Sequence, residues 1–152
     1  MNANKSFHMD NMSTDFEPQI VGFMCDWCSR ITADELEKAS HPIPSSTKVV
    51  GVPCSGRVDP LLLIRAYLHG ADGVWVAGCQ PGQCHFKVGN YQARRRMALL
   101  KTVFETLDLE ASRFHIEWLA EAQARYIAEI AARCEAQIKV QVPNTARSEL
   151  FI

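Results

Sequence analysis

The sequence predicts one α/β domain, and three observations lead to this fold class. Short apolar runs alternate with longer amphipathic runs, which is typical of strand–helix–strand units in a parallel sheet. The run at 73–78, GVWVAG, is apolar on both parities, as expected of a central strand covered on both faces. The connections are short, and with right-handed crossovers they favour a four-stranded, mostly parallel, flavodoxin-like sheet flanked by helices, in strand order 2-1-3-4.

Four segments have the composition of strands: 18–24, 47–53, 73–78 and 114–118. The last of these alternates apolar Phe114, Ile116 and Trp118 with polar residues, so we expect it at an edge of the sheet.

Four helices are expected between and after these strands. Thr32 and Glu35 form a capping box for a helix that ends near residue 40. Asp59 and Pro60 begin a second helix, and Gly70 ends it. Helical spacing of apolar residues predicts two longer helices, at about 90–107 and 121–140.

The 152 residues suit one domain, at 18–142, between a flexible N-terminal tail at 1–17 and a C-terminal tail at 143–152. Lys plus Arg (16) nearly balances Asp plus Glu (17), so no basic excess points to nucleic acid. No apolar run approaches the roughly 20 residues that span a membrane. The N-terminus lacks the apolar region of an export signal, so we expect a cytoplasmic protein, with reduced thiols.

Five of the six cysteines lie at or just after the ends of three predicted strands: Cys25 and Cys28, Cys54, and Cys79 and Cys84. The carboxyl ends of neighbouring parallel strands meet at one edge of a sheet, about 4.8 Å apart. We therefore expect these thiolates to converge on one metal centre.

Three chemistries remain open for this cysteine set. A Cys-x-x-Cys pair can be a thioredoxin-like dithiol, although here the predicted helix starts only at Thr32. Four thiolates can hold structural zinc, which favours paired Cys-x-x-Cys turns, whereas this chain has one. The second pair, Cys79 and Cys84, has the Cys-x4-Cys spacing of plant-type two-iron ferredoxins, and Gly78 and Gly82 would let the backbone wrap the sulfurs. This spacing favours an iron-sulfur centre.

With five thiols for four positions, we expect Cys79 and Cys84 on one iron and two of Cys25, Cys28 and Cys54 on the other. His85 offers an alternative ligand of the Rieske type. Cys134 shares the apolar face of the last predicted helix, so we expect a buried core thiol there.

Three further features have more than one interpretation. Arg57 would stabilise a reduced cluster or pair with Asp59 or Asp72. The run at 94–96, RRR, would bind an acidic partner or be a solvated helix face. Trp27 would shield the centre, contact a partner, or pack on the first helix.

Several segments resemble the delta subunit family of methyl-viologen-reducing hydrogenases, over about residues 18–140. They are CDWCS at 25–29, PCSGRVDP at 53–60, the stretch at 70–100 that contains GCQPGQCHFKVGN, and FHIEWLA at 114–120. The most specific motifs of this resemblance are CSGR-x-DP and GC-x-PG-x-CH-x3-GN.

The resemblance implies a [2Fe-2S] cluster bound by cysteines of this set. It also implies electron relay between a [NiFe]-hydrogenase or formate dehydrogenase and the flavin-containing component of heterodisulfide reductase. We expect no catalysis by the chain itself, because an electron carrier needs no general acid, base or nucleophile and no such signature is present.

Overall fold

The sheet has four parallel strands in the order β2-β1-β3-β4. The computed structural model describes residues 16–29, 31, 35–36, 38, 40, 42–119 and 124–146. Its strands are β1 (Ile20–Cys25), β2 (Thr47–Val52), β3 (Gly73–Cys79) and β4 (Phe114–Leu119). The predicted fold class and strand order are therefore confirmed, and β4 is an edge strand as expected.

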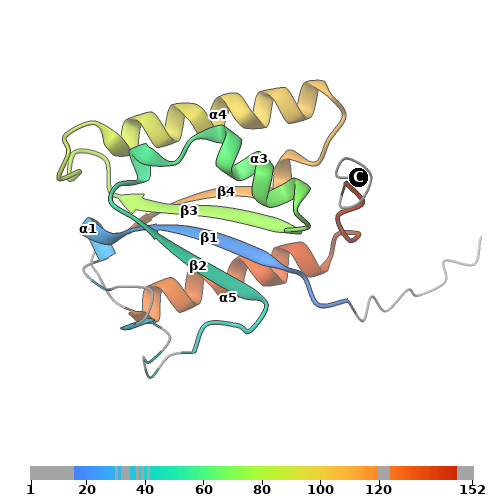
Figure 1. The fold of residues 1–152 in the computed structure, drawn as a ribbon, viewed down its shortest axis with the longest axis horizontal. Coiled ribbons are helices and arrows are strands. Elements are labelled where there is room, and N and C mark those ends of the chain that lie inside the picture. Colours follow the sequence, from blue (N-terminus) through green and yellow to red (C-terminus); the bar gives the residue numbers. More distant parts are fainter. Residues whose placement is uncertain are drawn as a thin grey trace, which may run out of the picture.

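Helices cover both faces of this sheet (Figure 1). They are α1 (Asp26–Ser29), α3 (Pro60–Leu68), α4 (Gly89–Thr106) and α5 (Ala124–Lys139), with the 3₁₀ helices η1 (Ser55–Arg57) and η2 (Ala111–Arg113). Helices α3 and α4 lie on one face, and α5 lies on the other (Figure 1). Most of the helix predicted at 32–40 lies outside the described residues.

Side-chain alternation along β3 divides the core into two layers. Val74 and Val76 pack against α3 and α4, whereas Trp75 and Ala77 pack on the α5 side. All seven residues of β3 are buried, which accounts for the apolar residues at both parities of its sequence.

The predicted caps of α3 are confirmed. The Asp59 carboxylate accepts a hydrogen bond from the backbone N–H of Leu61 (2.8 Å), and Pro60 occupies the first helical position. Gly70 follows the helix with φ of 102°, a left-handed conformation that glycine adopts without a Cβ penalty. This helix begins shortly after η1, so its capped start fixes where the Cys54 segment leaves the sheet.

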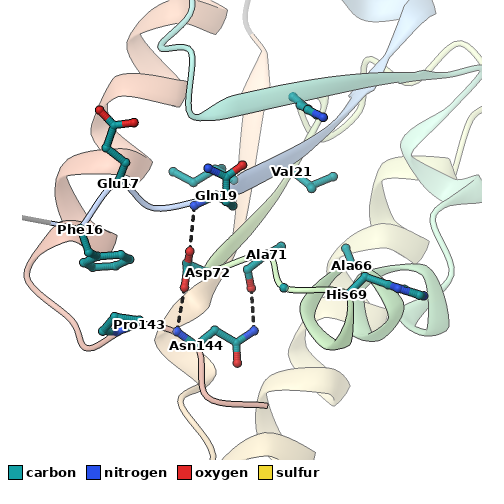
Figure 2. Close-up of a pocket in the computed structure, with 13 residues that line it drawn as sticks. Phe16, Glu17, Gln19, Val21, Ala66, His69, Ala71, Asp72, Pro143 and Asn144 are labelled. Carbon is teal, nitrogen blue, oxygen red and sulfur yellow. Dashed lines mark hydrogen bonds between the residues drawn. The ribbon is translucent and has the colours of Figure 1, made fainter. Parts of the chain in front are cut away.

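Asp72 and Asn144 tie the amino-terminal ends of β1 and β3 to the segment after α5 (Figure 2). The Asp72 carboxylate accepts hydrogen bonds from the backbone N–H groups of Gln19 (2.8 Å) and Asn144 (2.7 Å). The Asn144 amide donates to the carbonyls of Tyr67 and Ala71. A pocket of about 420 Å³ lies beside this network. Since β1 spans about 20 Å at about 3.3 Å per residue, the pocket is far from the carboxyl ends of the strands.

No helix within the described ranges combines the length and the apolar character needed to cross a membrane.

Candidate metal centre

The five cysteines predicted to converge lie together at the carboxyl edge of the sheet. Cys25 and Cys79 are the last residues of β1 and β3, and Cys54 follows β2 by two residues. Cys28 comes from α1, and Cys84 comes from the loop between β3 and α4. The side chains form one cluster in which every thiol except Cys28 is buried. This edge lies at the left in Figure 1, where α1 and the loop before α4 come together.

The thiols fall into a group of three and a group of two. The sulfur atoms of Cys25, Cys28 and Cys79 all lie within 4.8 Å of one another. The sulfurs of Cys54 and Cys84 are 3.8 Å apart. The expected grouping of Cys79 with Cys84 differs from this geometry, because the β3–α4 loop carries Cys84 across to η1.

A tight turn and a buried asparagine give the loop this course. Gly82 has φ of 83°, and the Gln83 N–H donates to the Gln80 carbonyl (2.9 Å), which reverses the chain. The fully buried Asn90 amide donates to the carbonyls of Cys79 (3.0 Å) and Gln80 (2.7 Å). The first turn of α4 therefore holds the start of the loop that presents Cys84. Asn90 belongs to a sequence motif and to the start of a predicted helix, but neither pattern indicates this role of its amide.

The N-terminus of α4 packs directly against the Cys54–Cys84 pair. A Cβ on Gly89 would overlap the Cys54 sulfur and lie 3.2 Å from the Cys84 sulfur, so only glycine fits without displacement. This approach places the positive end of an 18-residue helix beside two thiols. Such an environment favours the thiolate form, which is the form that binds metals.

The pKa shifts in this pair reflect burial and backbone donors. Burial opposes ionisation of Cys84, but the N–H groups of Asn90, Phe86 and Gly89, with the Cys54 thiol, outweigh it and lower the pKa. Burial raises the pKa of Cys54 to about 11, although the Gly56 N–H donates to its sulfur (3.4 Å) and counteracts part of the effect. Cys84 is therefore the easier of the two to ionise.

In the group of three, only the pKa of Cys25 is lowered. The Cys28 thiol, followed by the backbone N–H groups of Cys28, Ser55 and Trp27, lowers the pKa of Cys25 to about 5 against the effect of burial. The pKa of Cys28 is raised, mainly by its interaction with Cys25 and by burial. Burial also raises the pKa of Cys79, which the His85 backbone N–H partly offsets.

An exposed aromatic group covers the outside of the thiol cluster. The Trp27 indole stacks on the His85 imidazole, and the Phe86 ring meets both of them edge-on. Trp27 and Phe86 remain 51% and 50% exposed, so this surface is open to solvent. The expected packing of Trp27 on the first predicted helix concerns a segment that lies mostly outside the described residues. His85 acts on Cys79 through its backbone, while its ring lies against Trp27.

The arginine run of α4 divides into two kinds of residue. Arg94 and Arg95 are exposed, whereas the half-buried Arg96 donates to the carbonyls of Gly56 (2.7 Å) and Val58 (3.4 Å). Arg96 thus holds the η1 turn that follows Cys54, a role that the sequence run did not reveal. The expected pairing of Arg57 with Asp59 or Asp72 is not among the ion pairs of the described residues.

Cys134 is a core thiol, as predicted. It is 3% exposed and packs with Ile130 and Ile138 between α5 and the sheet. Burial raises its pKa to about 12, so it stays protonated at neutral pH.

The donor set fits a thiolate-bound metal centre. Five sulfurs meet in a mostly buried site, and backbone N–H groups supply the donors that thiolates and inorganic sulfide accept. Hard cations such as Mg²⁺ and Ca²⁺ prefer oxygen ligands, which this cluster lacks among the described residues. The arrangement therefore suits iron-sulfur or zinc chemistry.

Comparison with known proteins gives concordant matches. The family model described as methyl-viologen-reducing hydrogenase, delta subunit, matches residues 20–140. The iron-sulfur D subunit of an F420-non-reducing hydrogenase from Archaeoglobus profundus is 41% identical over 128 residues, which cover 84% of this chain and 93% of that protein. The corresponding vhc iron-sulfur protein of Methanococcus voltae, also from an F420-non-reducing hydrogenase, is 38% identical over 112 residues, 74% of this chain and 78% of that protein.

A third relative is a much longer protein. It is the A subunit of the ferredoxin/F(420)H(2)-dependent CoB-CoM heterodisulfide reductase of Methanosarcina acetivorans, and it is 39% identical over 106 residues. The match covers 70% of this chain but only 13% of that protein. A region similar to this chain is thus part of a larger polypeptide there.

Proposed function

Because the chain belongs to the methyl-viologen-reducing hydrogenase delta subunit family, we propose that it is an iron-sulfur electron-transfer subunit. It would relay single electrons through a [2Fe-2S] cluster from a hydrogenase, formate dehydrogenase or other oxidoreductase component to a heterodisulfide-reductase-like flavoprotein. The observation that carries this proposal is the meeting of five thiols from separate segments at one sheet edge. The two hydrogenase relatives, which are iron-sulfur proteins by name, support the choice of iron and sulfide.

We assign the ligands from the two thiol groups. Cys54 and Cys84 would hold one iron, since their sulfurs are 3.8 Å apart. Two of Cys25, Cys28 and Cys79 would hold the other. Cys25 and Cys79 are buried and end the neighbouring strands β1 and β3, whereas Cys28 lies on α1 and is half-buried. This difference favours Cys25 and Cys79 as ligands, with Cys28 as the extra thiol.

The protein environment would set the properties of the centre. A [2Fe-2S] cluster supplies a site that accepts and releases one electron. Backbone N–H groups around Cys25 and Cys84, together with the N-terminal end of α4, stabilise negative charge on sulfur. No side chain is required to move a proton.

The two rival chemistries have weaker support. A dithiol enzyme needs an accessible nucleophile, but Cys25, the thiol of the Cys-x-x-Cys pair whose pKa is lowered, is 0% exposed. The pair does enter a helix at once, contrary to expectation, yet α1 has only four residues. Structural zinc would also take four thiolates from this set. No contact of the described residues favours zinc over iron.

The long Methanosarcina relative supports the choice of partner. It belongs to a heterodisulfide reductase, and a region similar to this chain is part of that polypeptide. We infer that this chain docks on a heterodisulfide-reductase-like flavoprotein. We also propose a cytoplasmic location, where the thiols would stay reduced.

Electron relay can be tested with the natural assembly. The chain, tagged in its source organism and isolated anaerobically, should co-purify with a flavoprotein similar to the long Methanosarcina relative. Stopped-flow mixing of the reduced chain with that flavoprotein should reduce the flavin. Cluster-containing chain that fails to reduce the isolated flavoprotein would contradict the proposed relay.

A further inference from the structure

Ser55 is a buried polar residue at the cysteine edge whose role the fold does not explain. It begins η1, directly after Cys54, and is 0% exposed. Its hydroxyl oxygen has no hydrogen-bond partner within the part of the chain that the structure describes. Leaving a buried hydroxyl unsatisfied destabilises the folded state. Native proteins therefore rarely bury one without a partner or a functional reason.

Ser55 is next to three of the cysteine-bearing segments. It follows Cys54 in the chain. The Cys25 sulfur lies 3.8 Å from the carbonyl oxygen of Pro53, two residues before Ser55. A Cβ on Gly78, the residue before Cys79, would lie 2.6 Å from the Ser55 oxygen. The hydroxyl is thus enclosed between η1 and the end of β3.

Other buried hydroxyls without partners provide a comparison. Those of Ser46 and Thr47 have none among the described residues, and both lie at the start of β2. The six residues of β2 span about 20 Å, so these two hydroxyls are remote from the cysteines. Among the buried side-chain nitrogen and oxygen atoms that have no partner within the described residues, only the Ser55 oxygen belongs to a residue next to a cysteine in the sequence. Ser55 is therefore the residue of this group that lies at the cysteine edge.

We propose that the Ser55 hydroxyl donates a hydrogen bond to a sulfur atom of the iron-sulfur centre and raises its reduction potential. This inference rests on the proposed function. Reduction adds one electron, and a donor to sulfur stabilises the added negative charge. The proton stays on the serine oxygen throughout, so Ser55 is a tuning residue and takes no part in proton transfer.

The first experiment compares Ser55→Ala with a matched control. Ser46→Ala also removes a buried hydroxyl without a partner among the described residues, but at the opposite end of β2. Each cluster-loaded chain is titrated anaerobically with redox mediators, and the reduced fraction is followed by electron paramagnetic resonance. We expect a lower potential in Ser55→Ala than in the wild type, and the wild-type potential in Ser46→Ala.

A second variant keeps the hydroxyl but displaces it. The methyl group added by Gly78→Ala would lie 2.6 Å from the Ser55 oxygen and 2.9 Å from the Ser55 Cβ, so Ser55 must move away from β3. This variant should also lower the potential. In the double variant, the two shifts should not add, because both changes remove the same hydrogen bond.

Resonance Raman spectroscopy supplies a readout that a structural role of Ser55 would not move. Transfer of the wild type to D₂O should shift the iron–sulfur stretching bands, and Ser55→Ala should show a smaller shift. Equal potentials and equal D₂O shifts in wild type and Ser55→Ala, with the cluster retained, would overturn this inference alone. A chain that binds no iron and sulfide would instead overturn the proposed function on which it rests.

Discussion

The Trp27 indole and the His85 imidazole lie parallel, with ring centroids 3.7 Å apart and planes at 7°. Trp27 lies inside the Cys-x-x-Cys segment, and His85 follows Cys84 in the β3–α4 loop. The stack therefore joins the two groups of thiols on the outside of the cluster, independently of any metal. An aromatic pair of this kind contributes about 0.5–1.5 kcal/mol beyond the burial of its area.

Replacing Trp27 by Ala should make the centre easier to dismantle. Loss of about 0.5–1.5 kcal/mol between the two cysteine segments corresponds to about a 2- to 10-fold faster release of iron. Release is measured as bleaching of the visible absorbance in the presence of an iron chelator. Trp27→Phe keeps a flat ring against His85 and serves as the control. Release from Trp27→Ala at the wild-type rate would show that the stack does not hold the segments together.

Serine substitutions should separate the ligands from the extra thiol. We expect Cys28→Ser to keep most of the bound iron, because Cys28 lies on α1 and is the half-buried member of the cluster. Cys84→Ser should lose the iron, because Cys84 has three backbone N–H groups that favour its thiolate. Iron and acid-labile sulfide per chain, after identical anaerobic reconstitution, provide the comparison. Greater loss from Cys28→Ser than from Cys25→Ser would reverse the assignment within the group of three.

Gly89→Ala should disrupt the Cys54–Cys84 pair. The added methyl group would overlap the Cys54 sulfur, closer than nonbonded atoms approach. We expect loss of bound iron and a decrease of about 1–3 kcal/mol in the free energy of unfolding, as is typical of overpacking. The exposed Gln92→Ala, on the same turn of α4, is the control and should leave both quantities unchanged. Full iron content in Gly89→Ala would mean that the helix does not constrain the pair.

Cys134→Ser should affect stability and leave the metal centre intact. The serine hydroxyl would be buried among Ile130, Ile138 and other apolar groups, at a cost of about 1–3 kcal/mol. Denaturant unfolding measures the cost, and iron content gives the second readout. Loss of iron from a folded Cys134→Ser chain would show that this thiol is part of the centre.

The periodicity of apolar residues and the helix-capping residues were sufficient to predict the sheet. The apolar run at 73–78 identified β3 because both of its faces are covered, and the Asp59–Pro60 pair marked the start of α3. Neighbouring strand ends follow from the strand order, so the meeting of Cys25, Cys54 and Cys79 followed as well. The positions of strands and helix ends depend on local sequence, and the strand order follows from the topology. Sequence patterns therefore indicate both.

The grouping of the thiols depends on loop conformation, which the sequence patterns did not resolve. Cys84 reaches Cys54 because a turn at Gly82 and the buried Asn90 amide direct the loop toward η1. Similarly, Arg96 differs from Arg94 and Arg95 only in its position relative to η1. Such roles arise from tertiary contacts between segments distant in sequence.

Metal and sulfide analysis of the anaerobically purified wild-type chain tests the central claim most directly. We predict about two irons and two acid-labile sulfides per chain, the content of one [2Fe-2S] cluster, in a brown protein. Stoichiometric zinc without sulfide or visible absorbance would contradict the claim that Cys25, Cys54, Cys79 and Cys84 hold an electron-transfer centre.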